Sequence, residues 1–314
     1  MSKKIKKVLL VFFLVIVLAL PFIIGNTMAN MVLHPPWHKP GLTPGCSVVQ
    51  RAAAAPLCIE NPESGIREKF ERVNVPYKEG HVKGWFFPTG KNHKIVIFVH
   101  GAGADRRNGY VHLSYLQKAG YALVVYDAPN HGVSYNTGVG VTFGKYEQEG
   151  FLKILDWVKT NYAGAEIYVI ASSAGTSAVI LSKESWKGSI KAAVFENPLY
   201  SIDRIIRENP ITQKLPSIMI PFVYWLIELK AGFSPQDLLP NELVKSFPDI
   251  PVLVLHGTLD RTIPLQHGKD LYKNLSVSQK KFIKVEKGRH SMLMATIPRK
   301  FAAETLQLFA IGDK

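Results

Sequence analysis

From Arg72 to the C-terminus, short apolar runs alternate with segments whose apolar residues recur at helical spacing. Runs such as Lys94–Val99 (KIVIFV) are typical of strands buried on both faces of a sheet. Strands that alternate with helices predict an α/β fold, with a mostly parallel sheet covered on both faces. We expect strands at residues 73–77 and 81–87 (an edge hairpin), 94–99, 121–126, 168–170, 192–195, 251–255 and 281–285, and helices at 105–118, 143–162, 176–181, 265–275 and 291–310.

One connection is much longer than the others. Tyr200–Phe247 separates two predicted strands, which indicates a functional insertion such as a helical cap. Its centre, Ile218–Leu229, is strongly apolar and contains Phe222, Tyr224 and Trp225. Two interpretations stay open: these aromatic side chains line an acyl-sized pocket and touch a membrane, or the helix simply packs on the body.

The start of the chain has a different pattern, an uncharged apolar run from Val8 to Ile24. A basic flank before such a run is typical of a signal anchor or a cleaved signal peptide. The run is close to the roughly 17–25 residues that cross a bilayer, which favours an uncleaved membrane anchor over residues 1–30. Pro21 and Thr27–Ala29 support the alternative, cleavage and release. In both cases we expect the body outside the cytoplasm, either membrane-anchored or secreted or periplasmic. The basic flank consists of Lys3, Lys4, Lys6 and Lys7.

The two cysteines, Cys46 and Cys58, lie in a Pro-, Gly- and Ala-rich stretch. We assign residues 31–71 to an N-terminal extension and residues 72–314 to the main domain, with the cap at about 200–247. In an exported domain, two cysteines that bracket a short loop suggest a disulfide. A pair of free thiols is the alternative.

The formal net charge of +14 raises the question of nucleic-acid binding. The basic residues are scattered, and no helix or aromatic platform is organised to use them. A basic body beside an anionic membrane surface explains the excess more simply. We therefore expect no nucleic-acid partner.

The stretch Ile167–Val179 (IYVIASSAGTSAV) combines a buried strand, a run of small residues and a helix. Strand, small-x-Ser-x-Gly and helix make the pattern of a nucleophile elbow, a turn so tight that the neighbours of the serine must be small. The spacing to Gly175 selects Ser173 over Ser172. Ala171 stands where glycine is usual, and its small side chain is compatible with the turn. An ordinary strand-to-helix turn is the alternative.

Two later strand ends offer the partners that a serine hydroxyl needs. Asp260 lies in a turn after Val252–Leu255, and His290 lies in a loop after Phe282–Val285. A base must take the serine proton, and a third group must orient that base. The order Ser173, Asp260, His290, with each residue at the C-terminal end of a strand, predicts a catalytic triad.

Taken together, these motifs resemble the α/β-hydrolase superfamily, and within it the membrane-anchored serine hydrolases of the Bem46-like type. The resemblance covers the chain from about residue 73 onward and implies the α/β-hydrolase fold and ester chemistry. It implies Ser173 as nucleophile, His290 as general base and then acid, and Asp260 as orienting carboxylate. It also implies an oxyanion hole made by the backbone N–H groups of Ala102 and Ala174. The matching pieces are His100–Gly103, Asp127–Ser134, Ala171–Gly175, His256-Gly257-x-x-Asp260 and Gly288-x-His290.

Other polar residues near these motifs have more ordinary interpretations. Glu196, also at a strand end, is the alternative to Asp260 as the triad acid. His100 is expected to shape the oxyanion turn, and His256 to support the site from outside the triad. The histidines show no metal-ligand spacing, so we expect no metal. We also expect no cofactor, because backbone dipoles and an imidazole handle the charge of the reaction. Local hydrogen bonds are expected to brace a loop through Asp127, His131 and Ser134.

The favoured function is hydrolysis of an ester, thioester or related acyl bond through an acyl-enzyme. An apolar cap, a basic body and a membrane segment make lipids or other acylated molecules the candidate substrates. An acyltransferase that uses the same Ser-His-Asp site is one alternative, and a peptidase is a weaker one. A non-catalytic binding protein on the same fold is another, because fold alone does not prove activity.

Overall fold

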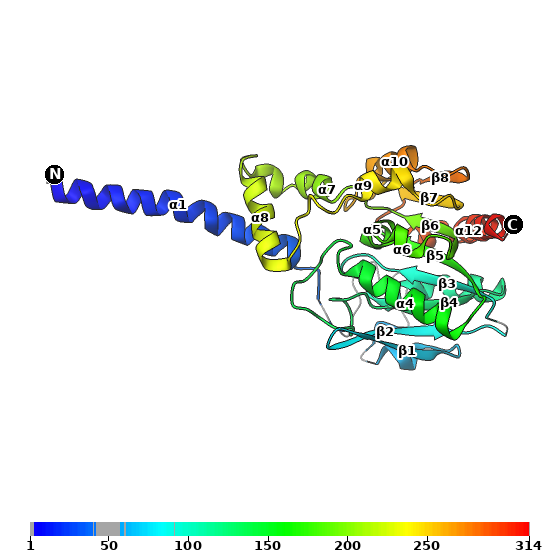
Figure 1. The fold of residues 1–314 in the computed structure, drawn as a ribbon. Helices are drawn as coiled ribbons and strands as arrows, with labels where there is room; N and C mark the ends of the chain where they lie inside the picture. Colours follow the sequence, from blue (N-terminus) through cyan, green and yellow to red (C-terminus); the bar gives the residue numbers. More distant parts are fainter. Residues whose placement is uncertain (1–2, 40, 42–56, 60, 91, 314) are drawn as a thin grey trace.

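The computed structural model describes residues 3–39, 41, 57–59, 61–90 and 92–313. Within these residues, eight strands form one sheet in the order β1-β2-β4-β3-β5-β6-β7-β8 (Figure 1). The β1–β2 hairpin is antiparallel and lies at one edge, and β3 to β8 run parallel to one another. The strands are β1 (Glu71–Tyr77), β2 (Gly80–Phe87), β3 (Lys94–Val99), β4 (Ala122–Tyr126), β5 (Glu166–Ser172), β6 (Ile190–Glu196), β7 (Val252–Gly257) and β8 (Lys280–Val285).

Helices cover both faces of the sheet because alternate strand residues point to opposite sides. In β3, Ile95 and Ile97 pack on one side, while Val96 and Phe98 pack on the other. The first face is covered by α4 (Glu147–Asn161), α5 (Ala174–Leu181), α6 (Lys183–Trp186) and α10 (Leu265–Asn274), and the second by α3 (Leu113–Lys118), α11 (Leu293–Thr296) and α12 (Pro298–Gly312). The alternation of strands and helices confirms the predicted α/β architecture.

The predicted insertion is a helical cap between β6 and β7. Its longest helix, α8, runs over Met219–Ala231 and ends at Gly232, whose φ of +71° is easily adopted by glycine. The other cap elements are α7 (Ile202–Glu208), η4 (Thr212–Lys214), α9 (Pro240–Leu243) and η5 (Val244–Ser246), and two further short helices in the chain are η2 (Pro62–Gly65) and η3 (Arg106–His112).

The N-terminal helix α1 (Lys3–Leu33) extends away from the body, and its last turns lie beside α8 (Figure 1). Judged on the residues the structure describes, none of the helices is both long enough and apolar enough to cross a membrane. The anchor therefore stays a prediction. Cys46 lies outside the described residues, so the Cys46–Cys58 disulfide also stays a prediction.

Three predicted helices have different boundaries in the structure. The segment predicted as one helix over 291–310 is two, α11 and α12, because Pro298 begins a new helix after Ile297, whose φ of −132° and ψ of 56° are not helical. α4 begins at Glu147 and not at Phe143, because the Glu147 carboxylate accepts the backbone N–H groups of Thr142 and Gly144. The segment 105–118 begins as the 3₁₀ turn η3 and continues as α3; Asp105 caps it, as predicted.

Candidate active site

The turn between β5 and α5 holds Ser173 in an uncommon backbone conformation. Its φ is +56° and its ψ is −126°, and its side chain is buried at the carboxyl end of the sheet. Glycines permit this close packing: a Cβ at Gly175 would clash with the carbonyl oxygens of Val99 and His100, and one at Gly101 would lie 2.6 Å from Ser173 Cβ. The strand, tight turn and helix predicted for this stretch are all present.

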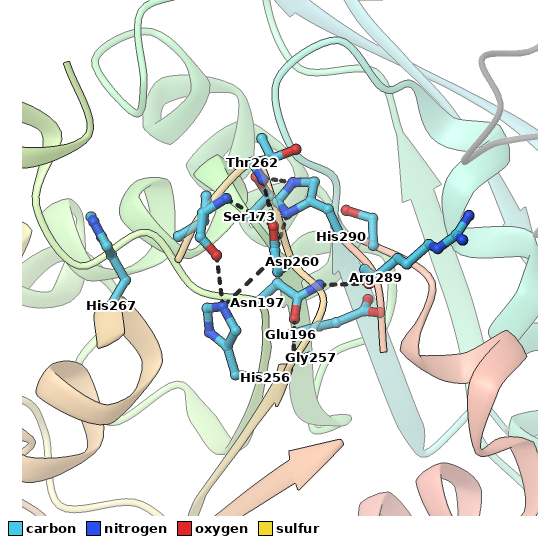
Figure 2. Close-up of polar contacts among 12 residues, drawn as sticks. Ser173, Glu196, Asn197, His256, Gly257, Asp260, Thr262, His267, Arg289 and His290 are labelled. Atoms are coloured by element: carbon cyan, nitrogen blue, oxygen red, sulfur yellow. Dashed lines mark hydrogen bonds and ion pairs between the residues drawn. The ribbon is translucent and has the colours of Figure 1, made fainter. Parts of the chain in front are cut away.

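His290 lies between Asp260 and Ser173 (Figure 2). Its Nδ1 donates to Asp260 Oδ2 at 2.7 Å, and Ser173 Oγ donates to its Nε2 at 2.9 Å. A carboxylate can only accept, so this geometry requires the tautomer that carries the proton on Nδ1. The free lone pair on Nε2 then faces the serine hydroxyl. Three residues predicted from separate strand ends are thus brought into direct contact.

The second oxygen of Asp260 is held by the turn that follows β7. Oδ1 accepts the backbone N–H groups of Thr262 and Ile263, both at 2.8 Å. His256 lies behind this turn, 3.6 Å from Asp260 Oδ2, and its Nε2 donates to Ile263 O at 2.9 Å. Burial lowers the pKa of His256, which favours the neutral ring. Its position agrees with the supporting role expected from the sequence.

Glu196, the alternative acid, has a different partner. Its Oε1 accepts the backbone N–H of Leu293 at 3.0 Å, and burial raises its pKa. The hydrogen bond to the imidazole comes from Asp260. Geometry therefore assigns the acid position beside His290 to Asp260.

Asn197, directly after β6, was not singled out from the sequence. Its Oδ1 accepts the N–H of Gly257, and its Nδ2 donates to Arg289 O, at 2.9 and 3.2 Å (Figure 2). It therefore joins the strand that leads to Asp260 with the loop that carries His290. Its φ of +45° is a conformation in which asparagine is enriched. An asparagine two residues after the predicted strand 192–195 was the available signal.

The predicted oxyanion donors, Ala102 and Ala174, both border the cavity next to Ser173. In the part of the chain that the structure describes, neither backbone N–H donates to a protein acceptor. Ala174 is also the first residue of α5, where the helix dipole favours negative charge. Two unpaired donors beside the serine suit an oxyanion.

Hydrogen bonds from His100 and from the loop around Asp127 support the turn that carries Ala102, as expected. His100 accepts the Ala128 N–H at Nε2 and donates from Nδ1 to Gly101 O. Burial alone would raise the pKa of Asp127. The charge and hydrogen bonds of Arg106, 2.7 Å away, outweigh that effect, so the pKa lies below its usual value. Further bracing bonds run from Ser134 Oγ to Asp127 O and from His131 Nδ1 to Pro129 O.

A cavity of about 730 Å³ opens over Ser173 and His290. Its volume lies within the roughly 300–1,000 Å³ typical of small-molecule sites. The cap contributes residues such as Ile205, Ile206 and Ile211, and α1 contributes Met28, Met31 and Val32.

The predicted pocket residues on α8 do not line this cavity. Phe222 packs against Phe22 of α1 and stacks on Trp225, which is 48% exposed. The Tyr224 hydroxyl donates to Asp203 Oδ1. The expectation that α8 aromatics form the pocket is therefore not met, because α8 turns these side chains toward α1, α7 and solvent.

Comparison with known proteins agrees with this geometry. Residues 96–304 match the family model described as "Alpha/beta hydrolase family". The human protein ABHD12B is 28% identical over 193 residues, which cover 57% of this chain and 49% of that protein. The lysophosphatidylserine lipase ABHD12 of Macaca fascicularis is 25% identical over 202 residues, which cover 62% of this chain and 48% of that protein. The match thus spans about half the length of these relatives.

Among solved structures, the esterase Pf2001 of Pyrococcus furiosus has a similar fold. The TM-score is 0.61 at 19% identity, and the match covers 87% of this chain and 98% of that one. The sheet order, the elbow and the family match lead to one conclusion. The chain belongs to the alpha/beta hydrolase family.

Proposed function

We propose that this protein is a serine hydrolase that cleaves an ester, thioester or related acyl bond through an acyl-enzyme. The observation that carries the proposal is the position of His290, within hydrogen-bonding distance of both Asp260 and Ser173. Such a relay activates a hydroxyl that is otherwise a poor nucleophile.

Each residue has a role in the proposed reaction. Ser173 Oγ attacks the acyl carbonyl while His290 Nε2 takes its proton, and Asp260 stabilises the imidazolium that forms. The N–H groups of Ala102 and Ala174 stabilise the negative oxygen of the tetrahedral intermediate. His290 then protonates the leaving group. A water molecule, deprotonated by the same imidazole, releases the acid and regenerates Ser173.

Replacement of Ser173 tests the proposal. We expect Ser173→Ala to lower kcat/KM for p-nitrophenyl esters by about 10⁴-fold or more, because among the described residues the Ser173 hydroxyl is the one hydrogen-bonded to His290 Nε2. A fluorophosphonate probe should label the wild type at Ser173 and leave the variant unlabelled. The neighbouring variant Ser172→Ala should keep its labelling. Ester hydrolysis that survives in purified Ser173→Ala at the wild-type rate would rule out the proposal.

Two related reactions are distinguished by other measurements. Transfer of the acyl group to an alcohol or amine would begin with the same acyl-enzyme, so product analysis with an added acceptor separates transferase from hydrolase. A wild-type protein that the probe does not label would instead favour a non-catalytic binding protein.

The proposed substrates are lipids or other acylated molecules. Support comes from the apolar side chains in the cavity wall and from a relative named as a lysophosphatidylserine lipase. The closer resemblance to the membrane-anchored Bem46-like group belongs to the same proposal. It includes a signal anchor over residues 1–30, an extension over residues 31–71 and a main domain outside the cytoplasm. A lysine-flanked apolar helix and the charge of +14 support it.

A further inference from the structure

The last turns of α1 form part of the wall of the cavity over Ser173. Met28, Met31 and Val32 line it, and so do Pro35 and Trp37 just beyond the helix. Met31 and Val32 follow Met28 by three and four residues, which places both on the same side of the helix as Met28. The N-terminal helix therefore borders the same space as the reactive serine.

Buried contacts join this end of α1 to the residues around the site. Met28 and Leu33 belong to one apolar cluster with Ala174, Leu199 and Ile206. α1 also approaches the cap closely, since a Cβ on Gly25 would meet the Phe222 ring at 2.7 Å. The end of α1 thus packs against the residues around Ser173 and also against the cap helix α8.

Hydrogen bonds fix the segment that follows α1. Val141 N donates to Leu33 O at 2.8 Å, and His38 Nε2 donates to Asn130 O at 2.9 Å. Trp37 lies against the turn that carries Ala102, because a Cβ on Gly103 would clash with its ring. The segment is consequently held in place beside the cavity.

We propose that Met28, Met31, Val32 and Trp37 form the acyl-chain subsite of this cavity, so that the N-terminal helix determines which chain lengths the site accepts. Their aliphatic, thioether and aromatic groups suit a hydrocarbon chain, and methionine adapts its shape to flexible ligands. The substrate class that fits is an ester of a long unbranched acid. This inference rests on the proposed ester hydrolysis at Ser173.

The test is a chain-length series on the full-length protein, using p-nitrophenyl butanoate, octanoate and laurate. Met31→Trp fills the subsite and should lower the laurate-to-butanoate ratio of kcat/KM by about tenfold or more. Butanoate hydrolysis is the reference in this ratio, because a four-carbon chain has less apolar surface to lose from the subsite than a laurate chain. The matched control Asn30→Trp changes the exposed neighbour on the same helix and should keep the wild-type ratio.

A second variant covers the case in which the bulky ring disturbs folding. Met31→Gln has a similar length and should lower the same ratio roughly fivefold, because a polar amide then faces the chain. Probe labelling of Ser173 verifies that each variant has an intact site. If labelled Met31→Gln and labelled Met31→Trp both keep the wild-type ratio, the subsite is wrong while the hydrolase stands. If wild-type hydrolysis does not depend on Ser173, the proposed function itself fails.

Discussion

Ser173 is held in a backbone conformation that few residues other than glycine adopt. A positive φ of this kind costs on the order of 1–3 kcal/mol, and it persists only where the surroundings impose it. Here Ser173 N donates to Glu196 O at 2.9 Å, and glycines 101 and 175 leave room for the turn. The small residues around Ser173 made this turn predictable from the sequence, because any larger side chain there would clash.

Burial also changes the protonation of a single residue, His112. It lies between the rings of Phe98 and Phe301, and burial lowers its pKa from 6.5 to about 3. The unfolded chain therefore binds a proton that the folded protein refuses over this range. Its contribution to stability is present above about pH 6.5 and is lost as the pH falls.

We expect this histidine to cost about 2 kcal/mol of stability between about pH 7 and pH 5. The free energy of unfolding, measured in urea at both pH values, should fall by that much less in His112→Leu than in wild type. Burial also lowers the pKa values of His38 and His267 to about 4. These two residues are present in both proteins, so their effect cancels in the comparison. Equal losses of stability in the two proteins would contradict the prediction.

At the scale of elements, the strands and their order along the chain were predictable because buried parallel strands form distinct apolar runs. The residues at which the helices begin were harder to predict from the sequence. The break at Pro298 and the late start of α4 depend on particular local contacts, such as the Glu147 carboxylate with Thr142 N. Periodicity alone does not encode these contacts.

The link that Asn197 makes between two loops leads to a prediction at this scale. Asn197→Ala removes the hydrogen bonds to Gly257 N and Arg289 O, so the loops of Asp260 and His290 lose their alignment. We expect kcat to fall roughly tenfold or more with little change in KM, because small displacements of reacting groups are costly. Steady-state kinetics on a short ester measures this.

Asn197→Gly is the matched variant, since glycine accepts the φ of +45° without strain. It should show the same loss of kcat, while the exposed Asn161→Ala on α4 should behave as wild type. Full activity in Asn197→Gly would mean that the backbone conformation, and not the hydrogen bonds, is what matters.

At the scale of the whole molecule, the cavity wall could not be predicted from the sequence. The pattern of Val8–Ile24 is that of an anchor or export signal, and nothing in it indicates that the next turns return to the site. Met28 and Trp37 reach the cavity through contacts with residues far along the chain, including Gly103 and Ile206. Contacts between residues so far apart in sequence depend on the assembled fold. For the same reason, the sequence pointed to the aromatic residues of α8 as the cavity wall and not to α1.

This arrangement predicts which form of the protein is active. Cleavage after Ala29 would remove Met28 and most of the helix that positions Met31 and Val32. Protein labelled at Ser173 by a fluorophosphonate should therefore retain a peptide that spans Met28 to Trp37, as peptide mapping by mass spectrometry can detect. If the labelled species begins after Ala29, the wall is dispensable for reactivity.

The bond between Val141 and Leu33 O has a mechanical consequence. α1 continues to Leu33 and is hydrogen-bonded to the body at that residue, so no flexible linker separates the helix from the body. A structure that holds the N-terminal end of α1 would therefore also fix the orientation and the height of the cavity opening above Ser173. The cavity would then be open only to molecules that lie within a narrow range of heights, and molecules outside that range would not reach it.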